Sequence, residues 1–258
     1  MMTLPHGKLL SAEAYAHAYS EQTGFEAVCI EARQQCNAAF LSAERPETIL
    51  EAGCGPRLLS AMPGVADAGF RRWAIVEPAR RYAEAARAGT AADARFSVVQ
   101  GYLESSLDEL RGLAPEGFAA AVVSSLVHET TEPLGLLTAV ARLLKSGGKI
   151  LVSAPNALSF HRLLATECGL IASPHDLSPL DVKLGHAAVF DPRSLTDLVA
   201  RAGFANLHCG GYLFKPFTNA QMQTMIEAIG PRLATGLISL GRRFPGHAAE
   251  IYVTGQRP

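Results

Sequence analysis

The stretch Thr48–Arg57, which reads TILEAGCGPR, decides the fold of this chain. Its apolar start is typical of the end of a buried parallel strand, and Gly53 and Gly55 then form a turn. Residues 57–62 follow and predict the first turns of a helix. A strand that runs through glycines into a helix gathers backbone N–H groups at one point, and a residue without a Cβ lets a ligand approach closely. We therefore expect a ligand site at this turn.

A second apolar run, residues 73–76, ends in an acid, Glu77. In α/β sheets that bind nucleosides, an acid about twenty residues beyond the glycine turn accepts hydrogen bonds from the ribose hydroxyls. The glycines read EAGCGP, with Glu51 shortly before them, rather than the dinucleotide pattern GxGxxG. This pattern resembles motif I of the class I S-adenosylmethionine (SAM) methyltransferases, and Glu77 stands where their ribose-binding acid stands. Glycines that serve only the packing of the turn are the alternative.

The order of elements extends the resemblance from Thr48 to the C-terminus. Apolar runs alternate with helical patterns through five strands, and a late pair of strands follows near residues 207–214 and 250–254. The resemblance implies an α/β fold: a Rossmann-like seven-stranded class I methyltransferase sheet, mostly parallel, with an antiparallel C-terminal hairpin. Residues 1–46 predict a helical N-terminal segment, which the resemblance implies is a lid. The resemblance also implies that residues 47–258 form the SAM-binding domain, with inserted helices at about 218–244.

The resemblance also implies that SAM is the cofactor. The residues expected to hold it lie on the turns that follow the strands: Glu51, Gly53, Gly55, Glu77, Tyr102, Leu103 and Ser124. One position departs from the family pattern. Many relatives carry an aspartate that reads the adenine amino group after the glycine that corresponds to Gly101, and this chain has Tyr102. Tyr102, the backbone of Leu103 and Glu104 are the alternatives for the adenine contact.

The sulfonium of SAM makes its methyl carbon electrophilic, so the protein has to position an acceptor and remove a proton. No metal and no covalent nucleophile are required, and we expect neither. His128 and Glu129 follow the fourth strand, at the edge where ligands bind, and a histidine suits a base near neutral pH. Glu129 either orients His128 or holds a substrate amine. Asn156, after the fifth strand, offers a donor and an acceptor. Helix capping is the alternative for His128 and Asn156.

Four residues are expected to contact the substrate: Tyr15, Tyr19, His161 and Tyr212. Tyr15 and Tyr19 lie one turn apart in the lid, so they share a face, and packing of the lid onto the body is the alternative. Residues 174–189 are polar and rich in proline and glycine, which predicts an irregular loop over the site. Four cationic or titratable side chains of this region are expected to be solvated rather than to bind a carboxylate or phosphate: Arg162, His175, His186 and Lys215.

The composition limits the class of protein. Of the 258 residues, 48% are hydrophobic, which is enough for a large core. The formal net charge is −1, and this near-neutral charge argues against a nucleic-acid partner. No apolar run is long enough to cross a bilayer, so we expect no membrane partner. The five cysteines are scattered without a CxxC pair, which argues against zinc and a disulfide framework and favours a reduced, cytoplasmic setting.

The resemblance therefore implies a SAM-dependent methyltransferase that acts on an oxygen or nitrogen of a small metabolite, in the setting of secondary metabolism. In-line transfer would be assisted by the His128–Glu129 pair. One alternative is an intramolecular displacement at the Cγ of the SAM aminocarboxypropyl group, which releases methylthioadenosine. Another is a non-catalytic SAM-binding protein. The acceptor and the oligomeric state have no signature in the sequence.

Overall fold

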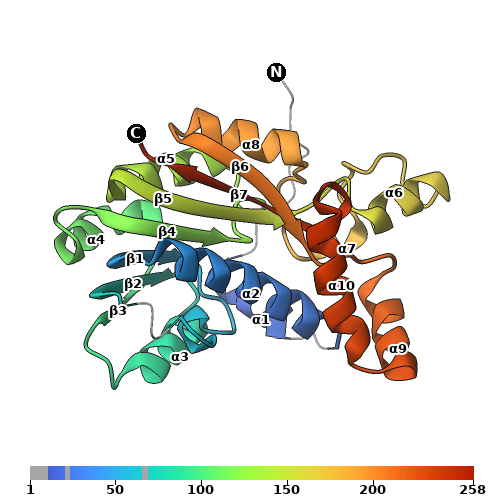
Figure 1. Ribbon diagram of the computed structural model, residues 1–258, viewed down its shortest axis with the longest axis horizontal. Helices are drawn as coiled ribbons and strands as arrows, with labels where there is room; N and C mark the ends of the chain where they lie inside the picture. The colour runs from blue at the N-terminus through green and yellow to red at the C-terminus, as the bar shows by residue number, and fades with distance from the viewer. Residues whose placement is uncertain (1–10, 21–23, 66–68) are drawn as a thin grey trace.

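The computed structural model describes residues 11–20, 24–65 and 69–258, and these form a seven-stranded sheet with helices on both faces (Figure 1). The strand order is β3-β2-β1-β4-β5-β7-β6. β1 to β5 pair in parallel, and β7 is antiparallel to both β5 and β6. The predicted methyltransferase sheet with its antiparallel C-terminal pair is confirmed. The strands are β1 Thr48–Ala52, β2 Arg72–Glu77, β3 Phe96–Gln100, β4 Phe118–Ser124, β5 Leu144–Pro155, β6 Ala205–Tyr212 and β7 Glu250–Gln256.

One face of the sheet is covered by α4 (Leu107–Leu113), α5 (Pro133–Leu143) and α8 (Pro192–Arg201). Their leucines and valines recur at helical spacing and pack on the apolar residues of β1, β4 and β5. α8 starts sharply because Asp191 and Ser194 form a reciprocal capping box and proline occupies the first turn. Figure 1 shows α5 and α8 on the side of the sheet opposite α1, α2 and α3.

The opposite face is covered by α2 (Glu26–Glu44) and α3 (Arg80–Thr90), and α1 (Ala12–Ser20) packs against α3. α2 buries Phe40 and Leu41 against the sheet, so this helix of the predicted lid is part of the main core. Burying two such side chains removes enough apolar surface to contribute several kcal/mol, about 1.5–3 for each. The role of residues 1–46 as a lid over the cofactor stays a prediction.

Two helices, α9 (Asn219–Ile229) and α10 (Arg232–Arg243), lie between the last two strands, where the sequence predicts inserted helices. These helices share a third apolar cluster with the start of α2, which includes Phe25, Met222 and Ile238. Together with α6 (Phe160–Glu167), they lie beyond the end of the sheet toward which β4 and β5 point (Figure 1). The remaining short turns are η1 Leu59–Ala61, η2 Leu103–Ser105 and η3 Pro245–His247.

Two local predictions are wrong. The helix expected over residues 57–62 is a single 3-10 turn, η1, because Met62 precedes Pro63 and adopts an extended conformation that cannot continue a helix. The loop expected over residues 174–189 contains a short helix, α7 (Pro179–Lys183). Ser178 and Asp181 form its capping box, a signal present in the sequence that the prolines masked.

The strand order reverses between β1 and β4, so their carboxyl ends open a crevice, the place where α/β sheets bind ligands. No helix in the described part of the chain is both long and apolar enough to cross a membrane.

Candidate active site

The turn after β1 forms the floor of a pocket at this crevice. Gly53 and Gly55 have φ values of +76° and +58°, a left-handed conformation that side chains other than glycine rarely adopt. A Cβ at Gly55 would meet no atom within 4 Å, so the backbone there faces open space. Both glycines and the neighbouring Cys54 line the pocket, which we call the cofactor pocket.

Glu77, at the end of β2, lies in the same pocket and is buried. Its carboxylate accepts hydrogen bonds from the backbone N–H groups of Cys54 (3.1 Å), Gly55 (3.2 Å) and Ala79 (2.9 Å). Burial raises the pKa of this carboxyl, and the three backbone bonds oppose that shift. The acid and the glycine turn, which are far apart in the sequence, are thus held together as the pattern predicts.

Glu51, at the end of β1, is also buried in the cofactor pocket. One carboxylate oxygen accepts a hydrogen bond from the indole Nε1 of Trp73 at 2.9 Å. The pKa of Glu51 is raised to about 8. Burial is the largest cause; the hydrogen bond from Trp73 lowers the pKa, and the nearby Glu77 carboxylate raises it. Burial of the carboxyl therefore favours its protonated form.

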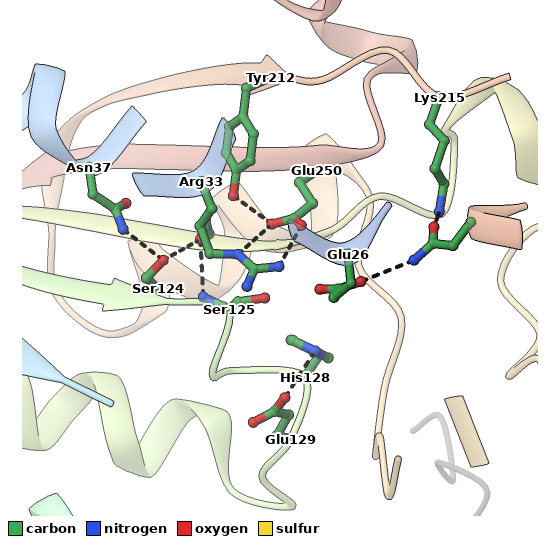
Figure 2. A network of polar contacts seen from close by, with 12 residues as sticks. Glu26, Arg33, Asn37, Ser124, Ser125, His128, Glu129, Tyr212, Lys215 and Glu250 are labelled. Carbon is green, nitrogen blue, oxygen red and sulfur yellow. Dashed lines mark hydrogen bonds and ion pairs between the residues drawn. The ribbon is translucent and has the colours of Figure 1, made fainter. Parts of the chain in front are cut away.

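The cofactor pocket also contains a residue that the sequence analysis missed, Asn37 of α2. It is 2% exposed, and its amide nitrogen donates to the hydroxyl of Ser124 at 2.9 Å (Figure 2). Its Oδ1 is buried without a hydrogen-bond partner among the described residues. A buried acceptor without a donor is costly, so this atom is suited to a ligand. Arg33, Gln34 and Asn37 lie on one face of α2, and this polar stripe on a partly apolar helix is the signal that was available.

The other predicted cofactor residues flank this pocket. Tyr102 lines it with a side chain that is 57% exposed, and Ser124 lines it at the end of β4. Leu103 is buried in the core beneath, where only its backbone could reach a ligand.

Ser125 has a positive φ of +54°, and its N–H donates to the carbonyl oxygen (3.1 Å) and the hydroxyl (3.0 Å) of Ser153. A strained conformation held this firmly at a crevice is typical of a functional site.

A second cavity of about 620 Å³, which we call the acceptor pocket, adjoins the first. Its size falls within the range of small-molecule sites. Arg33, Ser125 and Leu184 line both pockets, so the two meet at these residues. Charged and titratable side chains from distant segments line the acceptor pocket: Glu26, Arg33, His128, His161, Arg162, Asp181, His186, Lys215 and Glu250.

His128 and Glu129 stand at the boundary, with His128 lining the acceptor pocket and Glu129 the cofactor pocket. His128 Nε2 is 3.6 Å from a carboxylate oxygen of Glu129. Burial, followed by His186 and Arg33, lowers the pKa of His128 well below its usual value, so the imidazole is neutral at physiological pH. Its Nδ1 is buried without a hydrogen-bond partner in the described chain.

His186 packs edge-to-face on His128, with ring centroids 4.4 Å apart. Its Nδ1 is 2.9 Å from Asp181, which also receives Arg162 at 3.2 Å. The solvated positions predicted for Arg162 and His186 are therefore wrong, since 9% and 6% of these residues are exposed. Both are drawn inward by the buried Asp181 carboxylate. His128, Glu129 and His186 also place one ligand atom each within 4.8 Å of one another, a spacing compatible with a divalent metal.

The structure gives two predicted site residues supporting roles. The amide nitrogen of Asn156 donates to the carbonyl oxygens of Gly246 (3.0 Å) and Ala248 (2.9 Å), and its Oδ1 accepts from the N–H of Leu158 at 2.9 Å. With these backbone partners, Asn156 shapes the pocket wall and is poorly placed for proton transfer.

Tyr212 does not line the acceptor pocket, because it points into the core formed by α2 and α10. Its hydroxyl donates to Glu250 at 2.5 Å, and Glu250 also receives two bonds from Arg33, at 2.6 and 3.0 Å (Figure 2). Tyr212 therefore contributes to the acceptor pocket by holding Glu250.

His161, the third predicted substrate residue, lines the acceptor pocket from α6. Burial lowers its pKa to about 2, and its Nδ1 is buried without a partner in the described chain. The predictions for Tyr15 and Tyr19 concern side chains outside the described part of the structure, although both lie on α1.

Residues 30–209, more than half of the chain, match the family model described as a methyltransferase domain. The chain belongs to this methyltransferase family. S-adenosylmethionine is therefore its cofactor, and the protein is a SAM-dependent transferase. A comparison with curated proteins gave no match.

Solved structures support the fold of this methyltransferase. A SAM-dependent methyltransferase of Thermotoga maritima, described as a possible histamine N-methyltransferase, is 18% identical with a TM-score of 0.56; the match covers 96% of this chain and 100% of that chain. The N-methyltransferase NodS of Bradyrhizobium japonicum, in complex with S-adenosyl-L-homocysteine, is 12% identical with a TM-score of 0.55, over 95% and 99% of the two chains. At these identities the likeness concerns the fold alone.

Proposed function

We propose that this methyltransferase transfers the methyl group of SAM to an oxygen or nitrogen of a small metabolite. The observation that carries the proposal is the meeting of the two pockets at Arg33, Ser125 and Leu184, with His128 and Glu129 beside the junction. A cofactor site that opens into a separate polar cavity suits a reaction between two bound molecules.

Several groups of the cofactor pocket are suited to binding SAM. Glu77 would accept hydrogen bonds from the ribose hydroxyls, and the open backbone at Gly53 and Gly55 gives the ligand close access. The unpartnered Oδ1 of Asn37 and the carboxyl of Glu51 are acceptors suited to the ammonium group of the cofactor. A cation there would favour the charged form of Glu51, which burial alone disfavours.

SAM supplies an electrophilic methyl carbon and a neutral leaving group, so the residues around the acceptor have to orient it and take up a proton. The new bond to the acceptor atom forms as the carbon–sulfur bond breaks, and the sulfur keeps the electron pair. Neutral His128 has a ring nitrogen that can take the proton of the acceptor, and Glu129, whose carboxylate oxygen lies 3.6 Å from Nε2, would stabilise the positive charge that His128 then gains. Burial makes His128 a weak base, which suits an acceptor whose proton becomes acidic during transfer.

Displacement within SAM itself, with release of methylthioadenosine, remains the competing chemistry. It needs no second substrate, and an acceptor pocket of about 620 Å³ lined by charged groups favours transfer to another molecule. A reduced, cytoplasmic setting and a role in secondary metabolism belong to the same proposal, and all five cysteines being free is consistent with the first.

Product analysis tests the proposal. The protein is incubated with SAM alone, then with panels of amines, alcohols and phenols, and the two nucleoside by-products are quantified by mass spectrometry. We expect S-adenosylhomocysteine to accumulate only when an acceptor is present. Methylthioadenosine from SAM alone would replace methyl transfer by the intramolecular reaction, and neither product with any acceptor would favour a non-catalytic SAM-binding protein.

A further inference from the structure

Three carboxylates and three Arg or Lys side chains line the acceptor pocket: Glu26, Asp181, Glu250, Arg33, Arg162 and Lys215. Four of these six form two direct ion pairs. Arg33 binds Glu250 through two hydrogen bonds, and Arg162 contacts Asp181 at 3.2 Å. These four charges are compensated inside the protein. Glu26, at the start of α2, and Lys215, before α9, are the remaining two, and both line the pocket.

Glu26 and Lys215 do not contact each other directly in the described structure, because Asn219 lies between them. The amide nitrogen of Asn219 donates to Glu26 at 3.0 Å, and its Oδ1 accepts from the ammonium of Lys215 at 2.9 Å. Each charge thus has a neutral amide as its hydrogen-bond partner. Arg33 also attracts Glu26, but its guanidinium makes its two hydrogen bonds to Glu250. A partly buried charge whose hydrogen-bond partner is neutral keeps part of its desolvation cost, so a ligand of opposite charge would be favoured there.

We propose that Glu26 and Lys215 form the recognition site for a zwitterionic acceptor of the amino-acid class, which rests on the proposed methyl transfer. The ammonium of the acceptor binds Glu26, and its carboxylate binds Lys215. The nitrogen and oxygen of one amide hold the two protein charges side by side, and the ammonium and carboxylate of an α-amino acid likewise flank a single carbon. An amine or an acid alone would leave one protein charge without a counter-ion.

Other groups in the pocket agree with this assignment. Lys215 has three donor hydrogens, and its bond to Asn219 uses one. His161, which lines the same pocket, has a buried Nδ1 without a partner in the described chain and can bond to a polar ligand group. A small apolar substrate would leave the remaining donor hydrogens of Lys215 and the Nδ1 of His161 without a ligand partner.

The site also fixes the orientation of the acceptor. Figure 2 shows Glu26 and Lys215 on the side of the polar network opposite Asn37 and Ser124, which belong to the cofactor end. The charged head therefore lies away from the cofactor, and the remainder of the molecule points toward Ser125 and His128. The atom that receives the methyl group is then a side-chain oxygen or nitrogen of the amino acid, rather than its α-nitrogen.

Calorimetry on the full-length protein saturated with S-adenosylhomocysteine tests the site. The probes are the twenty protein amino acids, with the decarboxylated amine and the N-acetyl derivative of each one that binds. We expect at least one amino acid to bind, and loss of either charged group to weaken binding about tenfold or more. Lys215→Met should abolish the penalty for losing the carboxylate, and Glu26→Gln the penalty for losing the ammonium.

Matched controls come from the surface: Lys145→Met and Glu109→Gln remove the same charges from exposed positions and should behave as wild type. Binding of S-adenosylhomocysteine checks that each variant is folded, and the comparison of probes on the wild type holds even if a variant fails. If S-adenosylhomocysteine binds and no amino acid does, or if both derivatives bind as well as their parent, the zwitterion site is refuted while methyl transfer stands. Failure of S-adenosylhomocysteine to bind would instead refute the proposed function.

Discussion

The two halves of the site are built in different ways. The cofactor pocket is formed mainly by the turns that follow β1, β2, β3 and β4, with Asn37 of α2 beside them. Its acid, Glu77, accepts hydrogen bonds from three backbone N–H groups. The acceptor pocket is formed by side chains from α2, α6, α7, the segment before α9 and β7, joined by ion pairs over long stretches of sequence. Backbone geometry fixes the first, and long-range charge pairing fixes the second. Changes to each half should therefore have separable effects.

The largest effect is expected on stability, from breaking the charge network of the acceptor pocket. Arg33→Met leaves Glu250 and the hydroxyl of Tyr212 buried without the guanidinium that compensates the carboxylate. Removing one partner of a buried ion pair typically costs about 3–5 kcal/mol, and urea unfolding measures it. The exposed ion pair between Arg71 and Glu47 offers the control, since Arg71→Met should lower the free energy of unfolding by less than about 1 kcal/mol. Equal losses for the two variants would contradict a network that holds the pocket.

The cofactor half is tested by Glu77→Ala. If the Glu77 carboxylate accepts the two ribose hydroxyls as proposed, its removal should weaken SAM binding by about 3 kcal/mol, more than a hundredfold, with a smaller effect on any acceptor. Calorimetry with S-adenosylhomocysteine measures this, and Glu116→Ala, at an exposed position, is the control. Unchanged affinity would remove the ribose assignment from Glu77.

His128→Ala tests the junction between the halves. We expect the turnover number to fall by about tenfold to a hundredfold, because a general base contributes on this scale, while SAM affinity stays near wild type. Single-turnover kinetics with a responsive acceptor separate the chemical step from binding. Full activity would reduce His128 to a packing partner of His186.

A smaller effect concerns the pH dependence of stability. The pKa of Glu51 is raised to about 8 in the folded protein, above its value of about 4.3 in an unfolded chain, so the folded state binds the extra proton between these limits. Stability from this group is complete below about pH 4 and is lost as the pH rises through 8. Relative to wild type, Glu51→Gln should thus gain stability at pH 8 and show no gain at pH 4, measured by denaturation at each pH. Glu47→Gln, at the surface, should show no such trend.

No effect is expected from removing divalent metal. The ligand atoms of His128, Glu129 and His186 lie within 4.8 Å of one another, yet in-line methyl transfer requires no Lewis acid. Dialysis against a chelator should leave turnover unchanged. If activity is lost and one metal restores it, His128, Glu129 and His186 bind that metal rather than move a proton.

The sequence was sufficient for the sheet and the cofactor turn because both depend on local patterns. The strands are short apolar runs between glycine turns, and Glu77 occupies the end of β2 as its spacing predicts. The prediction of a helix over residues 57–62 was wrong for a local reason as well. It relied on the glycine pattern and did not take into account that the proline at position 63 disfavours helix at the residue before it.

Most contacts that form the acceptor pocket could not be predicted from the sequence. Arg33 and Glu250 are 217 positions apart, so no pattern in a window reveals their pairing. Arg162 and His186 resembled solvated surface residues until the fold placed the buried Asp181 carboxylate beside both. Asn156 and Tyr212 had the right chemistry for a site, but tertiary contacts use their polar atoms to hold backbone groups and Glu250.

A crystal structure of the protein with S-adenosylhomocysteine bound tests the central claim most directly. We expect the ribose hydroxyls on Glu77, the adenine beside Tyr102 and the sulfur facing the junction at Ser125 and His128, with the acceptor pocket open beyond it. A ligand lodged elsewhere, or a sulfur that faces away from the acceptor pocket, would contradict it.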